Sequence, residues 1–145
     1  MIAIINGPSL NLLGKREPHI YGTETFSDYL HKLRKEFPDV AIEYFQSNCE
    51  GEIITLIHKL GYDIPGCDGI VINPGAYSHY SYAIADALSA IPVDAVEVHV
   101  SNIHGREEFR RHSVTAAACR AMLCGFGLEG YSMAVGFLCR NKKKD

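Results

Sequence analysis

A loop near the start of the chain combines a phenol with a guanidinium. The segment GPSLNLLGKREPHIYG, residues 7–22, contains Arg16 and Tyr21 and follows a short apolar run. Two more arginines, Arg106 and Arg110, are spaced one helical turn apart later in the chain. A phenol removes a proton at neutral pH only where nearby cations stabilise the phenolate. These residue types predict a tyrosine base supported by arginines. The alternative is that the tyrosine packs its loop and the arginines belong to a solvated helix start.

A carboxylate and an imidazole alternate in the segment VEVHVS. Side chains two positions apart in a strand point to the same face, so Glu97, His99 and Ser101 share one side. A carboxylate beside an imidazole fixes the ring and favours its protonated form, which suits a general acid. One alternative is a purely structural Glu–His pair. Another is a metal site formed by His99, His104 and His112, although their spacing follows no compact metal-ligand pattern.

The segment NPGAYSH offers polar groups that could seat a ligand. It supplies Asn73, the backbone N–H groups around Gly75, and His79. Asp86 follows within the apolar segment YAIADALSA. For His79 the alternative is a histidine satisfied within a turn, and for Asp86 it is a carboxylate on the polar side of a helix. A contact between subunits is the functional interpretation of Asp86.

Regular elements must bring these segments together. Apolar runs alternate with amphipathic stretches, which is typical of βαβ units and a parallel sheet. The pattern predicts strands over residues 2–6, 40–46, 69–73, 93–100 and near 117–125, and helices over residues 25–37, 50–61, 79–91 and 128–139. Thr25 or Ser27 can cap the first helix, and Gly61 is placed to end the second. We therefore expect one α/β domain over residues 1–145, a flavodoxin-like, doubly wound, five-stranded parallel sheet in three αβα layers.

Such a sheet binds ligands at the carboxyl ends of its strands, near the point where the strand order reverses. The segments that contain Tyr21, Asn73 and His99 follow the first, third and fourth predicted strands. We therefore expect them to meet at one edge of the sheet, with the opening loop as the lid or wall of an active site.

Composition excludes several classes of function. The formal net charge of −3 provides no broad basic surface for nucleic acid, and no apolar run is long enough to span a membrane. The five cysteines form no CxxC pair, which predicts mostly buried free thiols in a reducing, cytoplasmic compartment. The opening loop has neither GxGxxG nor GxxxxGK[ST], and no lysine ends an apolar strand. These observations favour general acid–base catalysis.

Three long motifs resemble those of the type II 3-dehydroquinate dehydratases, also called type II dehydroquinases. They are the opening loop GPSLNLLGKREPHIYG, the central INPGAYSHYSYAIADAL and the segment EVHVSNIHGREEFRRHS. The segment GFGLEGYSMAV is similar to the family's C-terminal helix. The similarity covers nearly the whole chain in the family's order.

The resemblance implies a lyase that converts 3-dehydroquinate to 3-dehydroshikimate and water without metal or organic cofactor. It implies Tyr21 as the base, Arg16 as the lid arginine that supports its ionised form, and His99 as the acid, with Glu97 holding the imidazole. The enzyme would act in the shikimate pathway, towards chorismate and the aromatic amino acids, or in quinate breakdown. A flavodoxin-like module that binds a small anion without turnover is the alternative function.

The resemblance also implies how the substrate is held and how subunits assemble. It implies that Asn73, Val100 and Ser101 bind the substrate carboxylate and that His79 and Arg110 hold its ring hydroxyls. It also implies that Arg106 supports the tyrosine and that Asp86 reaches the site of a neighbouring subunit. The family usually assembles as a homododecamer. One position departs from the family: Ser9 stands where an asparagine usually helps to position a water that faces the enolate oxygen.

Overall fold

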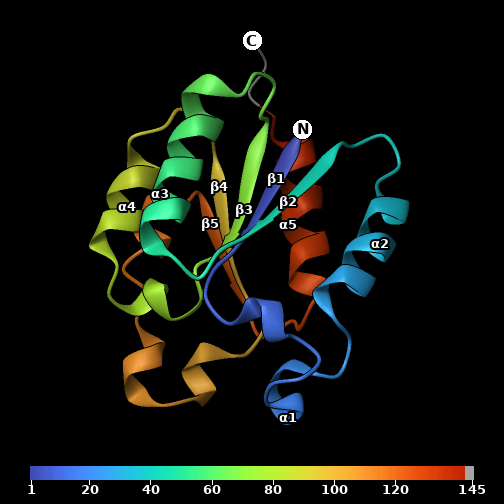
Figure 1. Cartoon of the computed structure of the whole chain (residues 1–145), viewed down its shortest axis with the longest axis vertical. Coiled ribbons are helices and arrows are strands. Elements are labelled where there is room, and N and C mark those ends of the chain that lie inside the picture. Colours follow the sequence, from blue (N-terminus) through green and yellow to red (C-terminus); the bar gives the residue numbers. More distant parts are fainter. Residues whose placement is uncertain (143–145) are drawn as a thin grey trace.

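Five parallel strands form the centre of the molecule (Figure 1). The computed structural model describes residues 1–142. The strands are β1 (Ile2–Asn6), β2 (Ile42–Gln46), β3 (Gly69–Asn73), β4 (Ala95–His99) and β5 (Ala121–Cys124). Their spatial order is β2-β1-β3-β4-β5, the order of flavodoxin-like sheets, so the predicted α/β class and sheet are confirmed.

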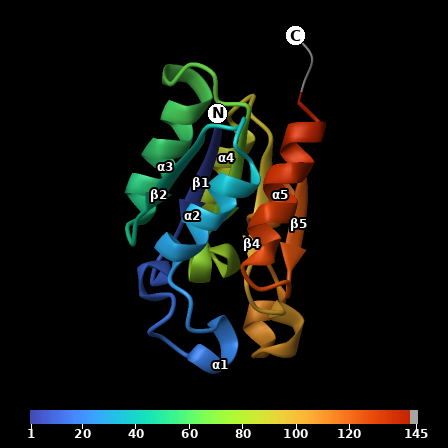
Figure 2. The same ribbon diagram turned by 90° about the vertical axis from the view of Figure 1, so that its right-hand side faces the viewer.

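Helices cover both faces of the sheet. In Figure 1, α2 (Phe26–Glu36) and α5 (Glu129–Arg140) lie to the right of the sheet and α3 (Glu50–His58) and α4 (Tyr82–Ser89) to its left; in Figure 2, α2 and α5 face the viewer. Strand β1 contributes alternate residues to the two cores: Ile2 and Ile4 pack with the first pair of helices, and Ala3 and Ile5 pack with the second. Strands buried on both faces have continuous apolar sequences, as IAIIN and GIVIN do.

Short helical turns gather where the strands end. The opening loop contains η1 (Leu10–Leu12) and α1 (Pro18–Tyr21), at the lower edge of the molecule in Figure 1. Further short elements at this edge are η3 (Gly75–His79) after β3 and η4 (Ile103–Gly105) and η5 (Glu108–Arg111) after β4, whereas η6 (Ala116–Ala118) precedes β5. The segments that carry the candidate residues thus follow the carboxyl ends of β1, β3 and β4.

The predicted strands and helices all exist, with shifts of a few residues at their ends. Thr25 caps α2, since its side chain accepts a hydrogen bond from the Asp28 N–H. Strands β2 and β4 are shorter than predicted, and α4 begins after the separate turn η3.

The expectation that Gly61 ends the second helix is wrong. The chain continues beyond α3 as a π-helical segment, η2 (Lys59–Asp63), which closes with the Ile64 N–H donating to the Lys59 carbonyl. Glycine is needed here for close packing, because a Cβ at Gly61 would lie 2.3 Å from Cγ2 of Ile91.

Arg106 and Arg110, although spaced one helical turn apart in the sequence, do not share a helix. Arg106 has an extended backbone and lies between η4 and η5, and Arg110 lies within η5. The segment is rich in charged residues and lacks the apolar periodicity that would bury one face of a longer helix.

The five cysteines are less buried than predicted. All are free, but Cys49 is exposed, and Cys67, Cys119, Cys124 and Cys139 are only partly buried. Cys49, Cys119 and Cys139 lie at or beside helix ends, Cys67 lies in the loop before β3, and Cys124 lies in the edge strand β5. No helix within residues 1–142 is both long and apolar enough to cross a membrane.

The packing at Gly61 makes a direct prediction. Gly61→Ala should lower the free energy of unfolding by about 1–3 kcal/mol, because the added methyl group overlaps Ile91. Urea unfolding at a fixed protein concentration measures this change.

The matched control is Gly51→Ala in the same helical segment, where the nearest atom to an added Cβ is the Cys49 sulfur at 3.9 Å. This variant should be as stable as the parent or more stable, since alanine favours helix over glycine. Equal effects of the two substitutions would contradict the packing argument.

Candidate active site

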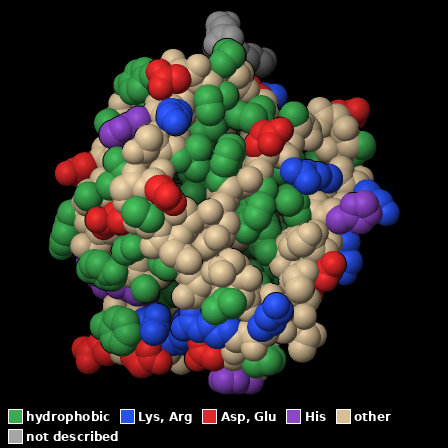
Figure 3. Space-filling model, viewed as in Figure 1, with side chains coloured by type: hydrophobic (Ala, Val, Ile, Leu, Met, Phe, Trp, Pro, Cys, Tyr) green, Lys and Arg blue, Asp and Glu red, His purple; other side chains and the backbone are tan. Residues whose placement is uncertain are grey.

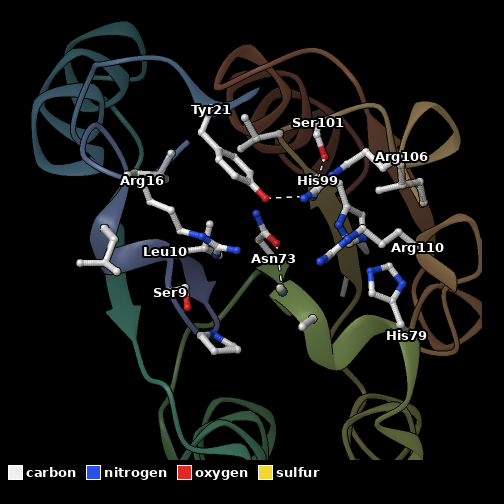
Figure 4. A pocket seen from close by; sticks show the side chains of 17 residues that line it. Ser9, Leu10, Arg16, Tyr21, Asn73, His79, His99, Ser101, Arg106 and Arg110 are labelled. Atoms are coloured by element: carbon white, nitrogen blue, oxygen red, sulfur yellow. Dashed lines mark hydrogen bonds between the residues drawn. The ribbon is translucent and has the colours of Figure 1, made fainter. Parts of the chain in front are cut away.

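One pocket opens at the carboxyl ends of β1, β3 and β4 (Figure 4). The opening loop, the β3–α4 turn and the segment after β4 each contribute side chains that point into a common space. The residues that line it are Pro8, Ser9, Leu10, Leu12, Leu13, Arg16, Tyr21, Asn73, Gly75, Ala76, His79, His99, Val100, Ser101, Ile103, Arg106 and Arg110.

Two glycines let the loops after β1 and β3 touch backbone to backbone. A Cβ at Gly7 would lie 2.5 Å from the Pro74 carbonyl oxygen, and one at Gly75 would lie 3.1 Å from that of Pro8. The Gly7 N–H donates to the Asn73 carbonyl at 2.8 Å. This approach sets the start of the opening loop beside Asn73, at the switch point of the strand order.

Tyr21 lies beneath two guanidinium groups. Nη1 of Arg106 donates to the Tyr21 hydroxyl oxygen at 2.9 Å, and Figure 4 shows the two groups directed at each other. The guanidinium carbons of Arg16 and Arg106 lie 5.8 and 5.6 Å from the ring centroid. One positive charge therefore lies beside the hydroxyl oxygen and a second lies near the ring.

The same arginines make the pocket attractive to anions. Arg106 also approaches the Ser101 hydroxyl, at 3.5 Å, and Arg110 lines the wall near His79. Lys and Arg side chains lie along this lower edge of the molecule together with Asp and Glu side chains (Figure 3), but no Asp or Glu within residues 1–142 lines the pocket itself. A cleft lined by one sign of charge raises the local concentration of ligands of the opposite sign.

His99 stands over a buried carboxylate. Its Nε2 lies 2.6 Å from Oε1 of Glu97, and the Glu97 side chain has no exposure to solvent. The alternation of residues in β4 places both side chains on one face, as the sequence predicts. With Nε2 committed to Glu97, Nδ1 is the nitrogen left for exchange of a proton within the pocket that His99 lines.

Asn73 is held from below by Tyr131 of α5. Its Nδ2 donates to the Tyr131 hydroxyl at 3.1 Å, and that hydroxyl donates to Oδ1 of Asn6 at 2.7 Å. Oδ1 of Asn73 accepts the Gly75 N–H. The expectation that this N–H binds a ligand is therefore wrong, because it is already bonded within the protein. Burial strongly raises the pKa of Tyr131, which keeps the phenol neutral and able to donate. The second Nδ2 hydrogen of Asn73 remains available to the pocket.

His79 has a defined tautomer in its neutral form. Nδ1 lies 2.8 Å from the His112 carbonyl oxygen, which only accepts, so Nδ1 carries the hydrogen. Burial lowers the pKa of His79 below its ordinary value of 6.5, with the charges of His99 and Arg110 acting in the same direction. At neutral pH the ring therefore presents Nε2 to the pocket as an acceptor for a hydroxyl.

The opening loop contains two left-handed residues that are not glycine. Ser9 has φ 68° and Glu17 has φ 41°. Such conformations cost on the order of 1–2 kcal/mol per residue. Ser9 is held by its N–H, which donates to Oδ1 of Asn48 at 3.1 Å, and Glu17 pairs with Arg16 at 3.1 Å.

The structure brings most of the predicted site residues together. Ten line the pocket: Ser9, Arg16, Tyr21, Asn73, His79, His99, Val100, Ser101, Arg106 and Arg110. Glu97 lies behind His99, and Asp86 is exposed on α4 and does not line the pocket of its own chain. In residues 1–142 no group of three or more His, Cys, Asp or Glu side chains is arranged to hold a metal ion.

Sequence reasoning missed the apolar wall of the pocket and the support beneath Asn73. Leu10, Leu13 and Ile103 are buried and line the wall, and their signal in the sequence is an apolar residue within an otherwise polar loop. Tyr131 is far from Asn73 in the chain and belongs to a helix with an ordinary apolar stripe, so no local pattern relates the two residues.

The fold and the pocket together define a flavodoxin-like α/β protein with a phenol–arginine group facing a Glu–His pair at the carboxyl edge of its sheet. The model of the family described as dehydroquinase class II matches residues 1–139. The chain belongs to this family.

Individual relatives agree over nearly their whole length. A 3-dehydroquinate dehydratase from Clostridium perfringens is 52% identical over 145 residues, covering 99% of both chains. One from Clostridium beijerinckii is 52% identical over 136 residues, covering 92% of each. The crystal structure of a type II dehydroquinase from Butyrivibrio crossotus superposes with a TM-score of 0.89 at 48% identity, covering 95% of this chain and 96% of that one.

The environment of His79 can be tested without a ligand. The Phe109 ring packs edge-on against the imidazole, with centroids 5.9 Å apart. Because burial is the main cause of the lowered pKa of His79, Phe109→Ala should raise this pKa towards 6.5. Titration of the His79 ring protons by NMR measures the midpoint.

Tyr82→Ala is the control, because it also removes an exposed aromatic ring but not one that packs on His79. Its His79 midpoint should match the parent's. A Phe109→Ala midpoint that also stays at the parent value would show that burial by this ring does not set the pKa.

Proposed function

We propose that the chain is a 3-dehydroquinate dehydratase, a hydro-lyase that removes water from 3-dehydroquinate to give 3-dehydroshikimate. Family membership and the names of the relatives support the activity. The observation that carries the proposal is the pairing of Arg106 with the Tyr21 hydroxyl in the same pocket as the Glu97–His99 pair. A base and an acid in one pocket are what an elimination of water requires.

Tyr21 is the proposed base. Its phenolate, stabilised by Arg106 and Arg16, takes a proton from C2 of the substrate, next to the ketone. The electron pair of the broken C–H bond passes to the ketone oxygen and forms an enolate. Such a proton is weakly acidic, so preorganised donors must stabilise the enolate as it forms. Closure of the opening loop over the substrate would exclude bulk water.

His99 is the proposed acid. As the enolate collapses, the C1–O bond breaks, and the imidazolium gives its proton to the departing hydroxyl, which leaves as water. The bond from His99 to Glu97 holds the ring in place, and the ionised carboxylate favours the imidazolium before the transfer. Return of the proton from Tyr21 to solvent and reprotonation of His99 complete the cycle.

The remaining lining residues hold the substrate in this proposal. Asn73, the backbone of Val100 and the Ser101 hydroxyl bind the carboxylate, with the amide oriented by its bond to Tyr131. His79 accepts from a ring hydroxyl and Arg110 donates to one.

Assembly and cellular role are also part of the proposal. Asp86 is exposed on α4. We place it at the site of a neighbouring subunit, and this role requires that the protein form an oligomer. By family resemblance we propose a homododecamer in the cytoplasm, acting in the shikimate pathway or in quinate breakdown.

The activity is tested by mixing the purified protein with 3-dehydroquinate, in the presence of a chelator, and following the ultraviolet absorbance of the conjugated enone product. Tyr21→Phe and His99→Ala should each lower kcat by about 10²–10⁴-fold, because each removes a positioned acid–base group.

Tyr82→Phe, which removes the hydroxyl of an exposed tyrosine on α4, is the control and should retain the parent kcat. No absorbance rise with the parent protein would favour the silent binding module. Near-normal turnover by Tyr21→Phe would overturn the assignment of the base.

Ser9→Asn tests the one departure from the family. If Ser9 holds a water that faces the enolate oxygen, an amide should hold it better, raising kcat by roughly two- to thirtyfold or leaving it unchanged, with little effect on KM. The backbone accommodates the change, because asparagine tolerates the left-handed conformation at φ 68° better than most residues.

Ser9→Ala, which lacks any polar group, is the companion variant and should lower kcat. Steady-state kinetics with matched thermal unfolding curves separate the chemical effect from stability. A marked fall in kcat for a folded Ser9→Asn protein would mean that the pocket is built around serine.

A further inference from the structure

Glu97 is a carboxylate enclosed at the centre of the protein. It lies in β4, between β3 and β5, and has no exposed surface. Besides the bond to His99, Oε1 accepts from the Ser113 hydroxyl at 2.6 Å and Oε2 accepts from the Thr115 hydroxyl at 2.5 Å. Both hydroxyls come from the segment between η5 and η6, which leads from β4 to β5.

The two hydroxyls direct their protons at the carboxylate. The Ser113 oxygen accepts the Ala116 N–H at 3.1 Å and lies 3.2 Å from the Thr115 hydroxyl, and its own proton goes to the closer Glu97 oxygen. Thr115 has one hydroxyl proton, and its shortest contact, at 2.5 Å, is with Oε2 of Glu97. The ring nitrogen of His99 is the third donor. Three donors point at two carboxylate oxygens, an arrangement suited to the ionised form, which only accepts.

The nearby Cys119 thiol adds no second negative charge beside Glu97. Burial, together with the nearby negative charge of Glu97, raises the pKa of Cys119 to about 12, so the thiol is neutral. His79 is the next titratable ring, with its centroid 6.4 Å from that of His99. Among the described residues, the bonds to Glu97 therefore come from His99 and the two hydroxyls.

The donors decide where the proton of the Glu–His pair resides. A buried carboxylate is costly unless it is hydrogen-bonded, and with too few donors it becomes a neutral acid. The same single proton would then sit on Glu97 instead of His99, and the imidazole would be neutral. A neutral imidazole is a far weaker acid than an imidazolium.

We propose that Ser113 and Thr115 are positioning residues that keep Glu97 ionised and thereby keep His99 as an imidazolium, whose Nδ1 proton is the one transferred. Neither hydroxyl lines the pocket, and both act through Glu97. The proposal rests on the proposed function in so far as His99 is the acid of the elimination. The location of the proton can be measured without turnover.

The test uses Thr115→Val, which keeps the shape of the side chain and removes the donor. We expect kcat to fall by about tenfold or more, the worth of a hydrogen bond to a charged group, with KM nearly unchanged. Infrared difference spectroscopy at neutral pH should show a new band from a protonated carboxylic acid. The band should vanish when Glu97→Gln is added, and Thr115→Ser should restore the parent kcat and spectrum.

Ser81→Ala is the matched control. Ser81 is also buried, but its hydroxyl caps α4 by accepting the Ile84 N–H. Its loss should lower stability while leaving kcat and the infrared spectrum unchanged. If Thr115→Val fails to fold, Ser113→Ala provides the same two measurements on the other carboxylate oxygen.

Two results would overturn the proposal. One is a folded Thr115→Val or Ser113→Ala protein that loses stability as Ser81→Ala does but keeps the parent kcat. The other is a lower kcat without a carboxylic acid band, which would show that Glu97 stays ionised without the hydroxyl. If the parent protein lacks dehydratase activity, the proposed function fails, and the spectrum alone then decides whether the hydroxyls keep Glu97 ionised.

Discussion

A negative charge buried within a parallel sheet constrains much of this structure. Moving an isolated carboxylate out of water costs several kcal/mol, and only well-placed donors offset that cost. Glu97 is flanked in the sheet by Ile72 of β3 and Met122 of β5, neither of which carries a side-chain donor. The donors must therefore come from the same strand, through His99, and from the chain that returns to β5. Ser113 and Thr115, between η5 and η6, supply these donors.

The pocket is organised around two charges of opposite sign. The carboxylate of Glu97 lies beneath His99, and the guanidiniums of Arg16 and Arg106 lie around Tyr21. In the proposed mechanism, the carboxylate supports an imidazolium on one side and the guanidiniums support a phenolate on the other. An uncharged pair at either place would lack this support, so the tyrosine and the histidine depend on their partners as much as on their own positions.

The loop that carries Tyr21 is fixed at its base and less constrained beyond it. Gly7 and Gly75 allow the β1 and β3 loops to meet, and the Ser9 N–H is tied to Asn48. Further along, Arg16 is exposed and Glu17 adopts a left-handed conformation. Backbone in such conformations is found at functional sites, where the surrounding contacts hold it. A loop that is fixed near Gly7 and Ser9 and exposed near Arg16 can close over a ligand.

The amino-acid sequence by itself determined the class of fold, the elements and most of the pocket. Continuous apolar runs such as IAIIN and GIVIN mark strands buried on both faces, and the alternation in VEVHVS places Glu97 and His99 on one side. These are local patterns with a period of two or 3.6 residues, and the rule for parallel sheets then brings the polar segments to one edge. Only the tertiary structure decided three contacts: Gly61 packs against Ile91, Tyr131 holds Asn73, and Thr115 holds Glu97. Each contact joins residues that no local pattern relates, so neither residue type nor spacing could specify it. The tertiary structure also decided that Arg106 is extended while Arg110 lies within η5.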